Sequence, residues 1–136
     1  MNRSVLFGYQ LLTGLSDATT GALLMVAPAL TLQLLHLCAL PSQLVYLSFV
    51  GAFVLPVGIA HLYGALAVYR GNCRRDLEIV WLLTAFIRSS VAVFVILQVL
   101  TGDLAAGWLF VGVFDGTCAF LQAIGLSKGW SIHAAR

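Results

Sequence analysis

Residues 77–100 read LEIVWLLTAFIRSSVAVFVILQVL, and residues 104–126 read LAAGWLFVGVFDGTCAFLQAIGL. Each run exceeds the roughly 20 mostly apolar residues that a helix needs to cross a hydrocarbon core of about 30 Å. Only the tripeptide TGD at 101–103 separates the two runs. Two long apolar runs joined by such a short polar turn predict two antiparallel membrane helices.

Two more runs of this kind lie upstream, at residues 4–27 and 44–69. The first ends before Pro28, because proline cannot continue a helix in its interior. The connection 28–43 is itself mostly apolar, so we expect a short helix in its middle, lying in the membrane interface. The four runs use most of the chain and predict a single domain, 1–136. Its expected fold class is all-α integral membrane, a four-transmembrane-helix bundle.

The composition supports this class. Hydrophobic residues make up 61% of the chain, charged residues only 9%, and the mean hydropathy is +1.01. A soluble domain carries about 25% charged residues, so these values exclude an ordinary soluble globule. The net charge of +2 is too small for a nucleic-acid footprint, so no nucleic acid is expected as a partner.

The basic residues give the expected orientation, because Lys and Arg favour the cytoplasmic side of membrane helices. Six of the seven lie in regions that four spans would place on one side: Arg3, Arg70, Arg74, Arg75, Lys128 and Arg136. We therefore expect cytoplasmic N- and C-termini in a multi-pass protein of a bacterial inner membrane. Aromatic residues near the span ends are expected to be interfacial anchors: Trp81, Trp108, Trp130, Tyr46 and Tyr69.

Three charged residues fall inside the predicted spans. At 1.5 Å of helix rise per residue, Asp17, Arg88 and Asp115 each lie about 15–16 Å from the end of their span. Inserted alone, each charge would cost about 2.5–3.5 kcal/mol. The matched depth on three helices predicts that they meet in the bundle interior, with Arg88 bridging the two carboxylates through its forked guanidinium.

Other polar residues extend this candidate site. On the first span, small and polar residues recur at helical spacing and form one stripe: Gln10, Thr13, Gly14, Asp17, Thr20 and Gly21. Thr84 lies one turn before Arg88. The full expected cluster comprises Asp17, Arg88, Asp115, His61, Thr20, Thr84 and Gln122. Two interpretations stay open: structural fixing of the helix register, or a site for a proton, an ion or a polar head group. His61 is either a core histidine bonded to a carbonyl, or a head-group ligand or proton relay beside the acidic pair.

No motif for a cofactor or a catalytic group is recognisable. The cysteines Cys38, Cys73 and Cys118 include no C-x-x-C pair, which argues against thiol redox chemistry. Only His61 among the histidines lies within a span, and bis-His haem would need two. No spacing resembles a zinc site. We expect no catalytic residue and no metal, and any lipid, quinone or pigment would bind at the helix surface.

The chain resembles the DoxX-like group of small bacterial four-helix membrane proteins. The resemblance covers size, four spans, Gly-rich helices, a first helix that ends at Pro28, and Arg88 within the third span. Some members of that group are associated with quinone-linked oxidoreductases, so the resemblance implies a link to electron transfer. It implies no catalytic residue for this chain.

Three functions follow as hypotheses. The first is a small non-catalytic membrane subunit of a larger electron-transfer or quinone-linked complex. The second is a small homodimeric transporter or channel that uses the buried acids and Arg88. The third is a membrane enzyme or binder acting on a sterol-like or isoprenoid lipid. The expected partners are membrane lipid, and either other membrane subunits or a second copy of the chain. Outward-facing phenylalanines would provide the contact surface: Phe49, Phe53, Phe86, Phe94, Phe110 and Phe120.

Overall fold

The computed structural model describes residues 2–37, 44–71 and 74–130, and all regular structure in this part of the chain is helical. The elements are α1 (Arg3–Val26), α2 (Pro28–Leu34), α3 (Val45–Arg70), α4 (Arg74–Thr101), the 3₁₀ turn η1 (Ala106–Trp108) and α5 (Leu109–Ser127). Three segments are long and apolar enough to cross a membrane: Val45–Arg70, Arg75–Thr101 and Ala106–Ser127. The predicted all-α class is therefore confirmed, with membrane-spanning character in three helices.

Helix α1 is as long as a span but more polar than the other three. Its 24 residues extend over about 36 Å at 1.5 Å per residue. Over its most apolar stretch, its mean hydropathy is lower than that of α3, α4 and α5, because polar residues recur along one of its faces. That face is buried in the protein, and it includes Gln10, Thr13 and Asp17. Whether α1 is a fourth span thus stays a prediction.

The helix ends differ from the expected spans in two connections. Pro28 does end α1, but it also starts α2 immediately, because a proline fits the first helical position, where no backbone N–H bond is lost. The predicted short helix therefore lies at the start of the 28–43 connection and not in its middle. The turn after α4 is longer than the expected tripeptide: Gly102 adopts a positive φ of 85° and α5 begins only at Leu109.

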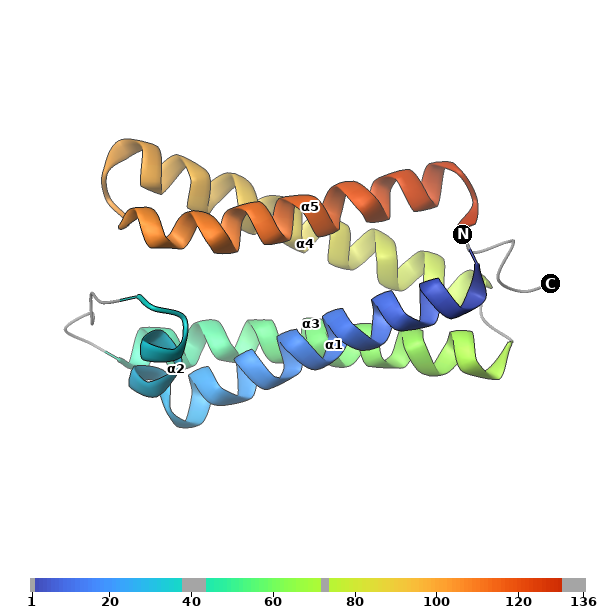
Figure 1. The fold of residues 1–136 in the computed structure, drawn as a ribbon, viewed down its shortest axis with the longest axis horizontal. Coiled ribbons are helices and arrows are strands. Elements are labelled where there is room, and N and C mark those ends of the chain that lie inside the picture. The colour runs from blue at the N-terminus through green and yellow to red at the C-terminus, as the bar shows by residue number, and fades with distance from the viewer. Residues whose placement is uncertain (1, 38–43, 72–73, 131–136) are drawn as a thin grey trace.

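The long helices form two layers, as Figure 1 shows. Helix α1 lies along α3 in one layer, and α4 lies along α5 in the other; the backbones approach most closely within each layer. The N-terminus lies at the end of the bundle where α3 and α5 finish, and α2 lies at the opposite end. Contacts between the layers are therefore made mainly by side chains.

Glycines on both helices permit the close approach of α1 and α3. A Cβ added to Gly58 of α3 would collide with the backbone of Ala18, and one added to Gly21 of α1 would collide with the backbone of Leu55. Gly14 packs less tightly against Leu62, whose nearest atoms lie 2.9 Å from such a Cβ. We call this contact between α1 and α3 the glycine seam. Small residues at such seams allow dispersion contacts that bulkier side chains would prevent.

Buried apolar residues form one cluster at each end of the bundle, and the buried polar residues lie between the two clusters. Near the N-terminus the buried cluster contains Leu6, Ala67, Val68, Leu77, Val80 and Trp81. At the other end it contains Leu24, Leu32, Leu37 and Leu47. The candidate polar residues lie between these two clusters along the helices.

The predicted role of Trp81 as an interfacial anchor is wrong. Its side chain is only 2% exposed and packs against Gly125, whose missing Cβ leaves room for the indole ring. Helix α4 begins at Arg74, so Trp81 already lies about two turns inside it. Tyr46 and Tyr69 are exposed near helix ends, as an interfacial position requires.

The glycine seam gives a first prediction. Gly58→Ala should lower the free energy of unfolding by about 1–3 kcal/mol, because the new methyl group overpacks against the backbone of Ala18. The measurement is unfolding of the purified protein by sodium dodecyl sulfate in mixed micelles. Gly8→Ala is the control, because nothing lies within 4 Å of a Cβ at that position, and it should change stability by less than about 0.5 kcal/mol. Equal effects of the two substitutions would contradict the seam.

Candidate buried polar site

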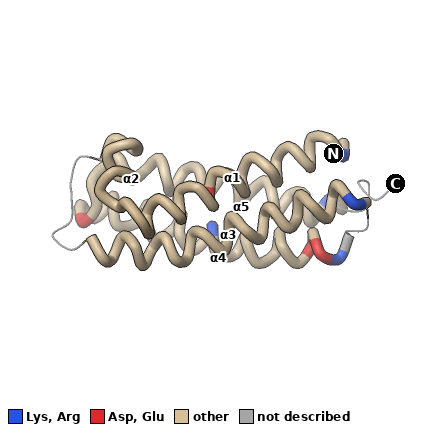
Figure 2. The backbone as a smooth tube through the Cα atoms, turned by 90° about the horizontal axis from the view of Figure 1, so that it is seen from below, with Lys and Arg blue, Asp and Glu red and all other residues tan. Residues whose placement is uncertain are grey.

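The three predicted charges meet in the bundle interior. Arg88 of α4 donates from Nη2 to Asp17 Oδ2 on α1 and from Nη1 to Asp115 Oδ1 on α5. The Arg88 side chain is only 3% exposed. Figure 2 shows blue and red positions midway along the bundle, well separated from the charges at its ends. The predicted contact of Arg88 with both carboxylates, which was inferred from their matched depth along the helices, is therefore present in the structure.

The guanidinium is enclosed by more than its carboxylates. The ring of Phe114 lies with its centroid 5.6 Å from Arg88 Cζ, a distance at which the ring face attracts a cation. Two carboxylates and one guanidinium leave a formal charge of −1 if all three are ionised. Because Asp17 lies in one layer and Arg88 and Asp115 in the other, this charged cluster joins the two layers electrostatically.

A second polar group lies closer to the terminal end of the bundle. It consists of His61, Gln10, Gln122 and Thr84, one residue from each of the four long helices. His61 Nδ1 hydrogen-bonds to Gln10 Oε1, and His61 Nε2 lies 3.3 Å from Gln122 Nε2. The same Gln122 nitrogen donates to Thr84 Oγ1 at 2.9 Å. All four side chains are buried, with at most 2% exposure; we call them the amide–histidine layer.

The hydrogen bonds of this layer have a consistent direction. Thr84 donates its hydroxyl to the Val80 carbonyl at 2.7 Å, so its oxygen is left to accept from Gln122. An amide nitrogen only donates, and therefore His61 Nε2 accepts from Gln122. His61 Nδ1 then carries the proton and donates to Gln10 Oε1. With the two amides in this orientation, each ring nitrogen of His61 has one amide partner.

Tyr9 is a member of the site that the sequence analysis missed. Its hydroxyl donates to the Cys118 carbonyl at 3.5 Å, which links α1 to α5. Its ring also meets His61 and Trp81 edge to face, with centroid separations of 6.2 and 5.9 Å. The sequence feature that could have indicated this role is the position of Tyr9 directly before Gln10, where the polar stripe of the first span begins.

Thr20, in contrast, does not join the site. Its side chain is partly exposed, and in the described part of the chain it contributes to neither the charged cluster nor the amide–histidine layer. Gly21, its neighbour, takes the buried position against Leu55 of α3, which turns Thr20 toward the edge of the α1–α3 contact. The stripe is thus real, but its last polar member lies outside the site.

Several buried polar atoms lack a protein partner in the described residues: Gln10 Nε2, Gln122 Oε1, Trp81 Nε1 and Arg88 Nε. Such atoms usually bind a water molecule or a ligand. The two amides provide one donor and one acceptor on opposite sides of His61. The amide–histidine layer can therefore still bind a small polar group.

An apolar groove leads toward this layer from the outside of the bundle. It lies between α3 and α4, has a volume of about 280 Å³, and is lined by Phe53, Pro56, Val57, Ala60, Ile79, Val80, Leu83, Thr84 and Ile87. Thr84 is its one polar lining residue and is also a member of the amide–histidine layer. Thr84 is thus the residue that the groove and the amide–histidine layer share.

The described residues contain no group of three His, Cys, Asp or Glu side chains arranged to hold a metal ion. Cys118 is a buried free thiol within α5. Cys38 and Cys73 lie outside the described residues.

Comparison with known proteins gives no relative for this arrangement. No family model, no curated protein and no solved structure matches the chain.

The charged cluster gives a second prediction. Arg88→Leu should destabilise the protein by about 3–5 kcal/mol, because two buried carboxylates lose their shared partner. Replacing Asp17, Arg88 and Asp115 together by leucine should be neutral or even stabilising, since the desolvation cost of all three charges disappears. The measurement is again unfolding by sodium dodecyl sulfate, with the yield of monodisperse protein as a second readout. A triple variant as unstable as Arg88→Leu would contradict the predicted coupling.

Proposed function

We propose that the chain crosses a bacterial inner membrane four times, through α1, α3, α4 and α5, with both termini in the cytoplasm. The distribution of charge along the bundle supports this topology (Figure 2). Helix ends bearing Arg3, Arg70 and Arg75 lie together at the end where the N-terminus lies. The opposite end carries Asp103 next to Gly102. Such an asymmetry is typical of a positive cytoplasmic face.

We further propose that the protein acts as a non-catalytic subunit of a larger membrane complex, near a quinone or another electron-transfer cofactor. The observation that carries this proposal is the distribution of polarity, because the charged cluster and the amide–histidine layer lie inside the bundle. The outer surface is left with large apolar side chains, and all six expected phenylalanines are more than half exposed: Phe49, Phe53, Phe86, Phe94, Phe110 and Phe120. Helix faces of this kind fit lipid or neighbouring membrane helices. The resemblance to the DoxX-like group supports the quinone link.

A second candidate function is favoured by the groove between α3 and α4. A groove of about 280 Å³ is near the lower end of the volumes of small-molecule sites, and such sites are mostly apolar with a few polar groups. Thr84 would meet the polar end of an isoprenoid or sterol-like lipid, while Phe53 and Ile87 contact its apolar part. In this alternative the protein is a lipid binder or a lipid enzyme, and the amide–histidine layer is its polar recognition site.

The proposed topology predicts the outcome of reporter fusions. Reporters placed after Arg136 and within residues 71–75 should read cytoplasmic, and a reporter near Leu37 should read external, because basic residues gather at the first two positions. Paired reporters, one active only in the cytoplasm and one only outside, provide the measurement. An external C-terminal reporter would contradict the topology.

The proposed role as a subunit predicts that larger membrane proteins copurify with the chain. Purification from its native membrane in mild detergent, followed by native mass spectrometry and an absorption spectrum, should reveal a partner subunit. A colourless monomer would contradict this role. A homodimer without other subunits would support the transporter hypothesis, and a tightly bound neutral lipid would support the lipid-binding alternative.

A further inference from the structure

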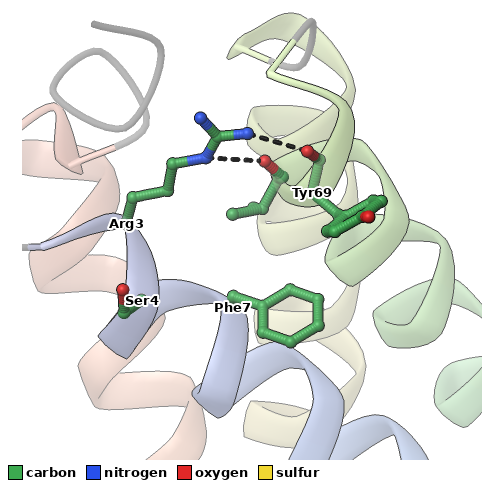
Figure 3. Close-up of a pocket in the computed structure, with 5 residues that line it drawn as sticks. Arg3, Ser4, Phe7 and Tyr69 are labelled. Carbon is green, nitrogen blue, oxygen red and sulfur yellow. Dashed lines mark hydrogen bonds between the residues drawn. The ribbon is translucent and has the colours of Figure 1, made fainter.

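Another pocket lies at the terminal end of the bundle, away from the buried polar site. It has a volume of about 330 Å³ and is lined by Arg3, Ser4, Phe7, Val68 and Tyr69 (Figure 3). Val68 and Tyr69 lie in the last turn of α3. Arg3, Ser4 and Phe7 lie in the first turns of α1. The pocket therefore lies where these helices would leave the hydrocarbon core.

The guanidinium of Arg3 is held in place by the end of α3. Its Nε donates to the Val68 carbonyl at 3.1 Å, and its Nη2 donates to the Tyr69 carbonyl at 2.7 Å. The Val68 carbonyl also accepts from the Gly71 N–H that caps α3, and a cation is favoured at the carbonyl end of a helix. Both acceptors are neutral groups, so the bonds fix the position of the guanidinium without neutralising its charge.

Within the described residues, the Nη1 edge of the fixed guanidinium is left for another acceptor. Figure 3 shows the third nitrogen of Arg3, Nη1, directed away from both carbonyls. Below it, Phe7 and Tyr69 form an aromatic wall, with ring centroids 6.3 Å apart. Ser4 is exposed at the rim and adds a hydroxyl. The five residues that line the pocket thus provide a cation, a hydroxyl group and an apolar wall.

We infer that this pocket binds the phosphate head group of an anionic membrane phospholipid. Arg3 Nη1 and the Ser4 hydroxyl donate to phosphate oxygens, and Phe7 with Tyr69 contacts the glycerol and the first methylenes of the chains. The basic residues Arg70 and Arg75 lie at the same end of the bundle, where α4 also carries Asp76 and Glu78. Basic residues near a membrane surface attract anionic lipid in this way. The inference rests on the proposed membrane topology but is independent of any role in a complex.

Charge substitution at the rim of the pocket tests the inference without removing Arg3. The full-length protein is placed in nanodiscs or mild detergent, and lipid adducts are counted by native mass spectrometry with phosphatidylglycerol or phosphatidylcholine. The unmodified protein should retain phosphatidylglycerol about fivefold more strongly, as expected for one basic contact. Ser4→Glu should abolish this preference, because a carboxylate then competes for Arg3. Ser4→Gln is the matched neutral control and should keep it.

Further variants separate the pocket from the general basic character of this end. Arg3→Gln should lose the preference, whereas Arg75→Gln, which removes a charge outside the pocket, should largely retain it. Glycerol 3-phosphate at millimolar concentration should not displace the lipid, because it lacks the chains that contact the aromatic wall. An unchanged preference in Ser4→Glu, an equal loss in Arg75→Gln, or displacement by glycerol 3-phosphate would each overturn the inference. These readouts need no topology reporter and no partner subunit, so failure here is distinguishable from failure of the proposed function.

Discussion

The buried guanidinium of Arg88 imposes the constraint on which the rest of the bundle depends. A cation at this depth needs acceptors within reach, and the structure provides one carboxylate from each layer, Asp17 and Asp115. A shift of α1 along its axis by one turn, about 5.4 Å, would separate Asp17 from Arg88. The ion pairs therefore fix the axial position of α1 relative to α4 and α5. They thereby also align the residues of the amide–histidine layer next to them.

Different interactions hold the helices within a layer and between the layers. Within the α1–α3 layer, glycines allow the backbones to touch, so dispersion contacts carry the association. Between the layers, the described contacts include the ion pair of Arg88 with Asp17, the Gln122–His61 hydrogen bond and the Tyr9 hydroxyl. Hydrocarbon gives apolar side chains no reason to prefer a neighbouring helix over lipid. Directional polar bonds therefore supply the specificity of the match between the layers.

The sequence allowed the charged cluster to be predicted because depth along a span is a simple count from its ends. Thr84 and Gln122 were also found, since helical spacing places them on the faces of Arg88 and Asp115.

Thr20 and Trp81 were misplaced for a different reason. Trp81 is buried because Gly125 of α5 leaves room for its indole ring, and Gly21, not its neighbour Thr20, takes the buried position against Leu55 of α3. Periodicity within one helix does not contain that information. The role of Tyr9 depends on a carbonyl of α5, which no side-chain pattern reveals. The number of membrane crossings stays a prediction, because the composition of α1 is ambiguous between a span and a buried amphipathic helix.

The separation of Asp17 and Arg88 along the chain has a consequence for the order of synthesis. The two residues are 71 positions apart, so at about 5–20 residues per second a ribosome needs roughly 4–14 s to add the second after the first. During that interval α1 and α3 can already associate through their glycines, while Asp17 has no cation to accept. The α1–α3 pair therefore carries Asp17 without its cation until α4 supplies Arg88, and the second carboxylate, Asp115, follows only with α5.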